Sequence, residues 1–529
     1  MLARARNITT FARSLLWILV LGLCSCGVRK DRATQSRLLN SLSSLDGYKN
    51  AIKIAREDEF YPDERSELLR KLERGTVFYL SGNYYQALQN FAEARRKSDE
   101  LFTKSLGGKL KSLGSENLDK YYGERYERSL IRFYESLVNY KLYRTGFYEA
   151  HTLMEGGKNL GIPKKELTDT EKRRHLMNAR SVLVEWDSLM NSYKAELAGK
   201  STYKVDLLAK LWAGFIHEQF DTAEDRQIAL QLYRDAKGVL LKYYNVYPPF
   251  NRKYKSFDDN FSKLAIMPLA EVRSKFIDST SVAKDVEIFI DSKIEKLSEN
   301  RKDNLFILLS DSFVSPKTAK KFKIGVSIDI LMHVGNNDQE FVAFVRNELS
   351  ETNKKDTMPL VEFEIPQIEP SKKEWVPYWV SISEADSKKE IAKFRLILVE
   401  PVTDIAVKSL NDRMALVYLQ TCATVATKYA TAMYAAYKIY KGNRSTLGAM
   451  LATASYLTAA RALAETTMAD LRYWSSLADR IYIGSTRLKP GKYNLTILPE
   501  KYIAGSKFVG YTQVINIGHS GSEFIDLSI

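Results

Sequence analysis

The spacing of apolar residues along this 529-residue chain changes near position 304. Before that point the apolar side chains follow the three- and four-residue intervals of amphipathic helices. After it come short apolar runs and alternating patterns that are typical of strands, such as Asn304–Leu309 and Val361–Ile365. A helical period does not suit a strand and an alternating pattern does not suit a helix, so we expect a helical half followed by a strand-rich half. The predicted fold class is α+β.

One helical motif recurs in the first half. Its clearest copy consists of Gly75–Phe78, Gly82–Tyr84 and Ala87–Ala94. This copy resembles a tetratricopeptide (TPR) repeat, in which small residues such as Gly75 let two helices touch and aromatic residues such as Phe91 fill the remaining space. Weaker copies consist of Tyr134–Tyr143 with Thr145–Ala150, and of Trp212–Phe215 with Ala229–Ala236. We predict an irregular TPR-like α-solenoid over residues 35–249, ended by Pro248 and Pro249, which lack the amide donor of a continuing helix; the alternative is a plain helical bundle.

Stacked helix pairs curve into a concave surface that suits peptides or partner proteins. Four tyrosines could line this surface or could simply pack inside the helices: Tyr121, Tyr122, Tyr126 and Tyr148. The expected partners of the repeats are therefore other proteins.

The second half is expected to begin with a polar connector, residues 250–303, which contains a helical stretch at Ser281–Leu297. A β-rich domain follows over residues 304–529, with a turn at Ser310–Pro316. Its expected strands lie at 304–309, 322–326, 361–365, 379–382, 394–398, 480–483, 488–497, 514–517 and 524–529.

An Ala-rich helical hairpin is inserted into this domain at about residues 411–470, with a turn at Lys441–Arg444. Small residues allow close helix packing, which is also how membrane helices pack. The uncharged run Ser445–Ala460 is shorter than the roughly 20 residues that a membrane span needs. A tightly packed soluble hairpin is therefore expected, and a membrane-inserting or oligomer-forming hairpin is the alternative.

The amino terminus has the pattern of a cleavable signal peptide. Three arginines precede the apolar run Leu15–Leu23, and no acidic residue appears before Asp31. The sequence Leu23-Cys24-Ser25-Cys26-Gly27 then resembles the lipobox of bacterial lipoproteins, and Cys26 fits its register better than Cys24 does. We predict a signal peptide over residues 1–25, lipidation at Cys26 and a tether over residues 26–34.

Two or more acyl chains on Cys26 would anchor the mature chain permanently in a lipid bilayer. Because Gly27 rather than Asp follows the cysteine, the resemblance implies the periplasmic face of the bacterial outer membrane. Removing the three signal arginines from the net charge of +15 leaves +12 for the mature chain. This basic balance favours contact with anionic lipid or anionic cell-wall polymer, and the compartment excludes nucleic acid as a partner.

Two further segments carry a family resemblance. Together with the repeat region, Ser310–Lys317 and Ala469–Leu477 resemble a family of uncharacterised bacterial envelope lipoproteins with tetratricopeptide-like repeats ahead of a C-terminal mixed α/β domain. The family pattern has glycine at the position of Ser312. The resemblance implies a location and a layout, without a biochemical activity.

The sequence lacks the usual signatures of catalysis. The histidines do not have metal-binding spacing, and there is neither a phosphate-binding glycine loop nor a Gly-x-Ser-x-Gly nucleophile elbow. Cys422, the remaining thiol of the mature chain, lies among alanines and threonines, where a thiol behaves as a small apolar residue. We therefore expect no catalytic, cofactor-binding or metal site, and no enzymatic activity.

Asp470, Arg472 and Trp474 form the most suggestive polar cluster, where the hairpin returns to the strands. A structural junction held by a salt bridge is expected there rather than a binding site. The leading hypothesis is a protein-binding scaffold in the cell envelope. The alternatives are a subunit of an envelope secretion or export assembly, and a cell-wall hydrolase or its activator.

Overall fold

The computed structural model describes residues 31–43, 47–108, 120–155, 158–196, 203–251, 253–257, 276–349, 360–371, 377–500, 510–518 and 522–529. Helices fill the first half and a seven-stranded sheet forms in the second, so the α+β prediction is confirmed. The predicted signal peptide and Cys26 lie outside the described residues. The predicted tether is described only from Asp31 onward, where a helix over residues 31–42 has already begun.

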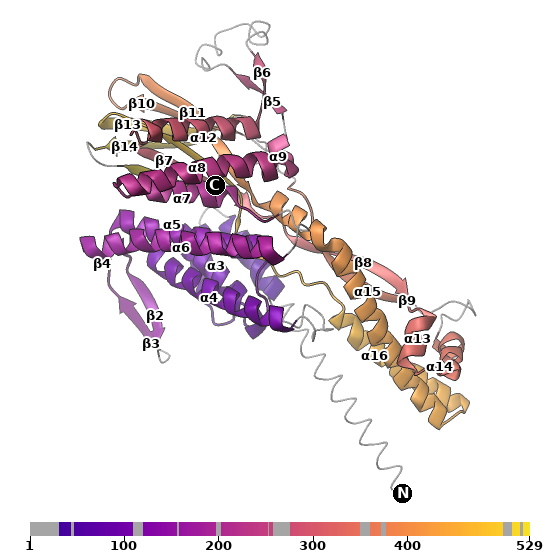
Figure 1. Ribbon diagram of the computed structural model, residues 1–529. Coiled ribbons are helices and arrows are strands. Elements are labelled where there is room, and N and C mark those ends of the chain that lie inside the picture. The colour runs from indigo at the N-terminus through magenta and orange to yellow at the C-terminus, as the bar shows by residue number, and fades with distance from the viewer. Residues whose placement is uncertain are drawn as a thin grey trace.

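Antiparallel helix pairs follow one another along the first half, and Figure 1 shows them stacked beside the sheet. The helices are α2 (Gly47–Arg56), α3 (Glu67–Leu80), α4 (Tyr84–Gly108), α5 (Arg125–Thr145), α6 (Asp169–Glu196), α7 (Leu207–Glu218), α8 (Ala223–Tyr243), α9 (Pro248–Asn251) and α12 (Val282–Ser298), with short 3₁₀ turns η1 (Glu64–Ser66) and η3 (Tyr244–Val246). Three two-stranded ribbons decorate this half and its connector: β1 (Phe147–Tyr148) with β4 (Lys165–Glu166), β2 (His151–Glu155) with β3 (Lys158–Ile162), and β5 (Lys253–Phe257) with β6 (Phe276–Ser281).

Two of the expected repeat copies form helix pairs with the same close contact. A Cβ atom added to Gly75 on α3 would lie 2.7 Å from the Phe91 ring on α4, and one added to Gly214 on α7 would lie 2.7 Å from the Tyr233 ring on α8. Both aromatic rings are buried. At these two positions glycine is needed because a partner ring occupies the space of a side chain.

We expect Gly75→Ala to lower the free energy of unfolding by about 1–3 kcal/mol, because Phe91 cannot move away in a packed core. The Phe91 ring stacks on Tyr134 at 5.5 Å and also contacts Trp474 at 5.9 Å. The matched control is Gly238→Ala in α8, where no atom lies within 4 Å of the added Cβ. That change should stabilise the protein by about 0.5–1 kcal/mol through helix propensity. Urea denaturation compares the two, and equal effects would contradict the packing argument.

The middle copy differs from the prediction. The motif Thr145–Ala150 predicts a glycine turn that leads into the second helix of the pair, but Gly146 ends α5 in the left-handed conformation, with φ 73°, and the next helix begins only at Asp169. The ribbons β1–β4 and β2–β3 fill the gap, so a glycine that resembled a repeat turn is a helix C-cap. Of the four tyrosines, Tyr121 and Tyr126 are buried in the core, which is the second of the two expectations, whereas Tyr122 is exposed and Tyr148 half-buried.

Strand order in the large sheet is β14-β13-β10-β11-β12-β7-β15. Its strands are β7 (Leu305–Phe313), β10 (Tyr378–Glu384), β11 (Glu390–Pro401), β12 (Ala478–Thr486), β13 (Gly491–Pro499), β14 (Tyr511–Ile517) and β15 (Glu523–Ser528). Neighbours are antiparallel except β15, which runs parallel to β7. The predicted turn at Ser310–Pro316 is wrong for its first residues, because β7 continues through Phe313 in register with β12.

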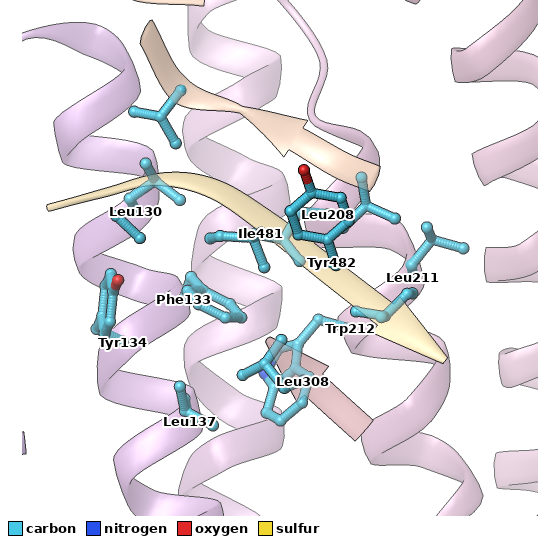
Figure 2. Packing of buried hydrophobic residues seen from close by; sticks show 14 of the residues in the cluster. Leu130, Phe133, Tyr134, Leu137, Leu208, Leu211, Trp212, Leu308, Ile481 and Tyr482 are labelled. Atoms are coloured by element: carbon cyan, nitrogen blue, oxygen red, sulfur yellow. The ribbon is translucent and has the colours of Figure 1, made fainter. Parts of the chain in front are cut away.

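One apolar core joins the helices to this sheet. The ring of Phe215 on α7 stacks on Phe306 of β7 with centroids 3.9 Å apart, and Phe133 on α5 meets Trp212 edge-on at 5.6 Å. Figure 2 shows Trp212 lying beside Leu308 of β7, with Ile481 of β12 above them. The helices of the first half therefore pack against the sheet, and helices and sheet share one apolar core.

A carboxyl group is buried inside this core without a cationic partner. Glu400 at the end of β11 accepts a hydrogen bond from the Tyr244 hydroxyl (3.1 Å), and its Oε1 has no hydrogen-bond partner. Burial raises the pKa of Glu400 well above its ordinary value, and the nearby Asp206 carboxylate raises it further. The folded protein thus holds this proton at pH values where the unfolded chain releases it.

We therefore expect Glu400→Gln to stabilise the protein at pH 8, by about 1–3 kcal/mol, the typical cost of a buried polar group that lacks a full set of partners. Because the folded pKa is raised, wild type loses stability as pH rises above about 4.5, whereas the neutral amide does not titrate. Denaturation at pH 4 and pH 8 measures this, and Glu384→Gln on the surface is the control. A difference that does not grow with pH would contradict the assignment.

Candidate functional site: an arm and its root

A second lobe extends from the body of the protein (Figure 1), and we call it the arm. Its elements are β8 (Lys317–Gly325), α13 (Ile328–Val334), α14 (Gln339–Phe344), the π-helical turn η4 (Val345–Leu349), β9 (Leu360–Ile368), α15 (Val402–Gly442) and α16 (Thr446–Thr466). β8 and β9 pair antiparallel over their full length. The arm has an apolar core of its own, centred on Phe363, Met433 and Tyr437. Met414 packs against both this core and that of the body.

The expected helical hairpin is present in the arm. α15 starts at Val402, earlier than residue 411, because it continues directly from β11. The chain reverses between Gly442 and Thr446, where the Ser445 side chain accepts a hydrogen bond from the amide of Gly448 and caps α16. At about 1.5 Å per residue, the 41 residues of α15 reach about 60 Å.

α16 leaves one apolar face uncovered. Ala452 and Tyr456 are buried in the arm core, whereas large residues on the other side of the helix are exposed. Their exposed fractions are 62% for Leu447, 65% for Met450, 53% for Leu451 and 53% for Leu457. Positions spaced by three and four residues share one helix face, so these side chains form a single stripe, which we call the α16 stripe. Within the described ranges no helix is long and apolar enough to cross a membrane.

Two arm elements are tied to the body by one buried carboxylate. Glu124, the N-cap of α5, accepts a hydrogen bond from Lys317 Nζ at the start of β8 (2.6 Å) and another from Arg413 Nη2 on α15 (2.7 Å). Burial alone would raise the pKa of Glu124, but the two cations lower it to about 2. The carboxylate therefore stays charged and holds both arm elements against the body.

The return segment, residues 469–477, enters the body beside the same helix. Trp474 is fully buried, its backbone amide donates to Glu127 of α5 (2.7 Å), and its indole N–H donates to Thr76 of α3 (2.8 Å). Asp470 accepts two hydrogen bonds from the Arg472 guanidinium, at 2.9 and 2.7 Å. The cluster expected from the sequence thus lies buried where the arm meets the helices.

Glu73 on α3 completes this junction, which we call the arm root. Its carboxylate is fully buried and accepts hydrogen bonds from the amides of Ser475 (2.7 Å) and Ser476 (3.1 Å) and from both serine hydroxyls. Burial raises the pKa of Glu73, and the serine donors oppose that shift. Such a carboxylate fixes the path of the return segment, because removing it would leave several buried donors without partners.

Both segments that carry the family resemblance meet at the arm root. Ser310–Lys317 leads into the arm at Lys317, and Ala469–Leu477 leads out of it past Glu73. Ser312 has φ 63°, in the left-handed region that favours glycine. The two segments therefore form the connections between body and arm.

The residues considered for catalysis lie elsewhere. Cys422 is half-buried on α15 beside Tyr418, and burial raises the pKa of its thiol. His175 bonds to Tyr148 and Asn139, and His217 bonds to Asp225. His519 lies outside the described residues. Within the described part of the chain, no cluster of His, Cys, Asp or Glu side chains is suited to a metal ion.

Comparison of the chain with protein-family models, with curated proteins and with solved structures gives no match.

Proposed function

We propose that this protein is a lipoprotein of the bacterial cell envelope, anchored through Cys26 on the periplasmic face of the outer membrane, and that it acts as a protein-binding scaffold. The observation that carries the anchor is the order of features at the amino terminus: arginines, the apolar run Leu15–Leu23, then the lipobox-like Leu23–Gly27. A permanent membrane anchor on a chain with a long arm suits a protein that holds partners near a bilayer.

The repeat-like helices support the scaffold proposal. The Gly75–Phe91 and Gly214–Tyr233 contacts occupy equivalent places in two helix pairs, as the conserved small and aromatic positions of tetratricopeptide repeats do. We propose that these pairs are divergent repeats and that their outer surface binds other envelope proteins.

The buried carboxylates of the arm root do not favour the hydrolase alternative. A glycoside hydrolase needs two carboxylates that face a sugar across an open cleft. Glu73 and Glu127 are both fully buried, and their oxygens accept hydrogen bonds from serines, a tyrosine and backbone amides. Carboxylates used in this way hold a structure together, which favours the scaffold.

A role in a secretion or export assembly is the second candidate. The α16 stripe favours it, because contiguous exposed apolar residues mark binding surfaces. The size of the complex that is purified with the protein from membranes would separate a lipid-anchored scaffold from a subunit of a stable assembly.

Lipidation makes the first testable prediction of this proposal. Cells grown with an alkyne fatty acid should label the wild-type chain and the Cys24→Ala variant, but not Cys26→Ala, and only Cys26→Ala should lose the mature, outer-membrane form. The reason is that the acyl chains are transferred to a single thiol. Label that persists in Cys26→Ala, or that is lost in Cys24→Ala, would overturn the assignment.

A further inference from the structure

We infer that the α16 stripe rests in the interface of the bilayer to which the chain is anchored, with anionic phospholipid as its partner. This inference depends on the proposed lipidation at Cys26 and adds a second, non-covalent membrane contact on the arm.

The first support is the chemistry of the stripe. Leu447, Met450, Leu451 and Leu457 are each more than half exposed, and the run Ser445–Ala460 contains no charged residue. Burying such side chains at the boundary between headgroups and acyl chains removes apolar surface from water. With 16 uncharged residues the run is shorter than a span of roughly 20, so a position in the plane of the interface is favoured.

The charge of the hairpin favours anionic phospholipid as its partner. From Met414 to Ala464 the hairpin carries only cationic side chains and no carboxylate. These cations are Lys428, Lys438, Lys441, Arg444 and Arg461. Although Lys441 pairs with Asp338 and Arg444 with Glu340 on α14, both cations remain more than half exposed. Arg444 and Arg461 directly flank the uncharged run Ser445–Ala460, and an apolar stripe flanked by cations is attracted to anionic headgroups.

The same charge disfavours a second copy of this chain as the occupant. Two identical hairpins that meet stripe to stripe would bring together two sets of cations, of which Lys441 and Arg444 alone are paired with carboxylates of α14 in the described contacts. Like charges across an interface oppose association. An anionic bilayer presents the opposite charge.

The first described residues, from Asp31 onward, lie at the arm root and are close in sequence to the proposed anchor, Cys26. Asp31, Arg32 and Gln35 line a cavity of about 10 Å³ together with Leu471 and Arg472 of the return segment, and the Gln35 amide donates to the Tyr473 carbonyl (3.2 Å). Asp31 follows Cys26 by five residues, which span at most about 18 Å. α16 ends at Thr466, just before this return segment, and Leu447 lies 19 residues away at its other end, about 28 Å at about 1.5 Å per residue. With the arm root held near the bilayer by a lipid on Cys26, the stripe meets the membrane when the arm lies along the bilayer surface. Tethering raises the effective concentration of a second, weak contact.

The test uses the purified, lipidated full chain in vesicles. In a Cys422→Ala background, a polarity-sensitive fluorophore is attached to Met450→Cys on the stripe or, as the matched control, to Asp386→Cys in the β10–β11 turn of the body. In phosphatidylglycerol-containing vesicles, the probe at position 450 should shift its emission to the blue and be quenched by brominated acyl chains. The probe at 386 should do neither, and both effects at 450 should weaken in phosphatidylcholine vesicles.

Other results would overturn the inference in distinguishable ways. Emission at 450 that is typical of water, in a protein whose Cys26 carries fatty-acid label, would overturn the membrane contact alone. A blue shift that persists in detergent without bromine quenching would assign the stripe to a second copy. Absence of label on wild type would overturn the anchor and the inference together. Because its positions are exposed, Leu447→Glu with Leu451→Glu should abolish the quenching while leaving the thermal midpoint unchanged.

Discussion

Replacing Trp474 with alanine is expected to lower the free energy of unfolding by about 3–5 kcal/mol, the usual cost of removing a fully buried aromatic side chain. The indole contacts the ring of Phe91 on α4, at 5.9 Å, and the ring of Tyr134 on α5, at 5.4 Å. Its N–H also donates to the Thr76 hydroxyl (2.8 Å), which would lose that partner. The loss would therefore combine a cavity with a broken buried hydrogen bond.

The matched variant is Trp474→Phe, which keeps most of the ring and loses only the N–H donor. It should cost about 0.5–1.5 kcal/mol, the net contribution of one hydrogen bond, plus a small packing loss. Urea denaturation followed by circular dichroism measures both variants. Equal losses for the two would mean that the hydrogen bond, and not the packing of the ring, dominates at this position.

Local patterns in the sequence were sufficient to locate the strands from β7 onward and the hairpin, but not the short ribbons of β1 to β6. The alternation at Val361–Ile365 lies within β9, and the helical stretch Ser281–Leu297 corresponds to α12 with Ser281 as its N-cap. Such patterns reflect which face of a single element is buried, so they can be read without knowing the partner. They failed at Gly146, because a glycine that closes a helix and a glycine that turns between two helices look alike in sequence.

The arm root shows what local patterns cannot supply. Asp470, Arg472 and Trp474 can be recognised as a cluster from the sequence because they are close together in the chain. Glu73 did not, although it is the main acceptor of the return segment, because its partner Ser475 lies 402 positions away. Glu73 is one of several charged residues in α3, so in the sequence it is indistinguishable from a residue on a solvated face.

Loss of the Glu124 carboxylate should have the other large effect. Glu124→Gln is expected to cost about 3–5 kcal/mol at pH 7, because it leaves a buried cation without its counter-charge. The Lys317 side chain is only 5% exposed and should contribute most of this, whereas the Arg413 side chain, 36% exposed, can turn to water. The double variant Glu124→Gln with Lys317→Gln should lose less than the sum of the two single variants, since each single change breaks the same pair.

The stability that the Glu124 carboxylate contributes should change with pH in a definite direction. Arg413 and Lys317 overcome the effect of burial and lower the pKa of Glu124 to about 2 in the folded protein, against about 4.5 in the unfolded chain. The stabilisation is therefore fully present above pH 4.5 and is lost as the pH falls toward 2. The buried carboxyls of Glu73 and Glu127 have raised pKa values and titrate in the opposite sense, but they are present in wild type and variant alike. The difference in stability between wild type and Glu124→Gln should thus shrink on acidification, and a difference that is constant from pH 7 to pH 3 would mean that the carboxylate does not hold the arm by its charge.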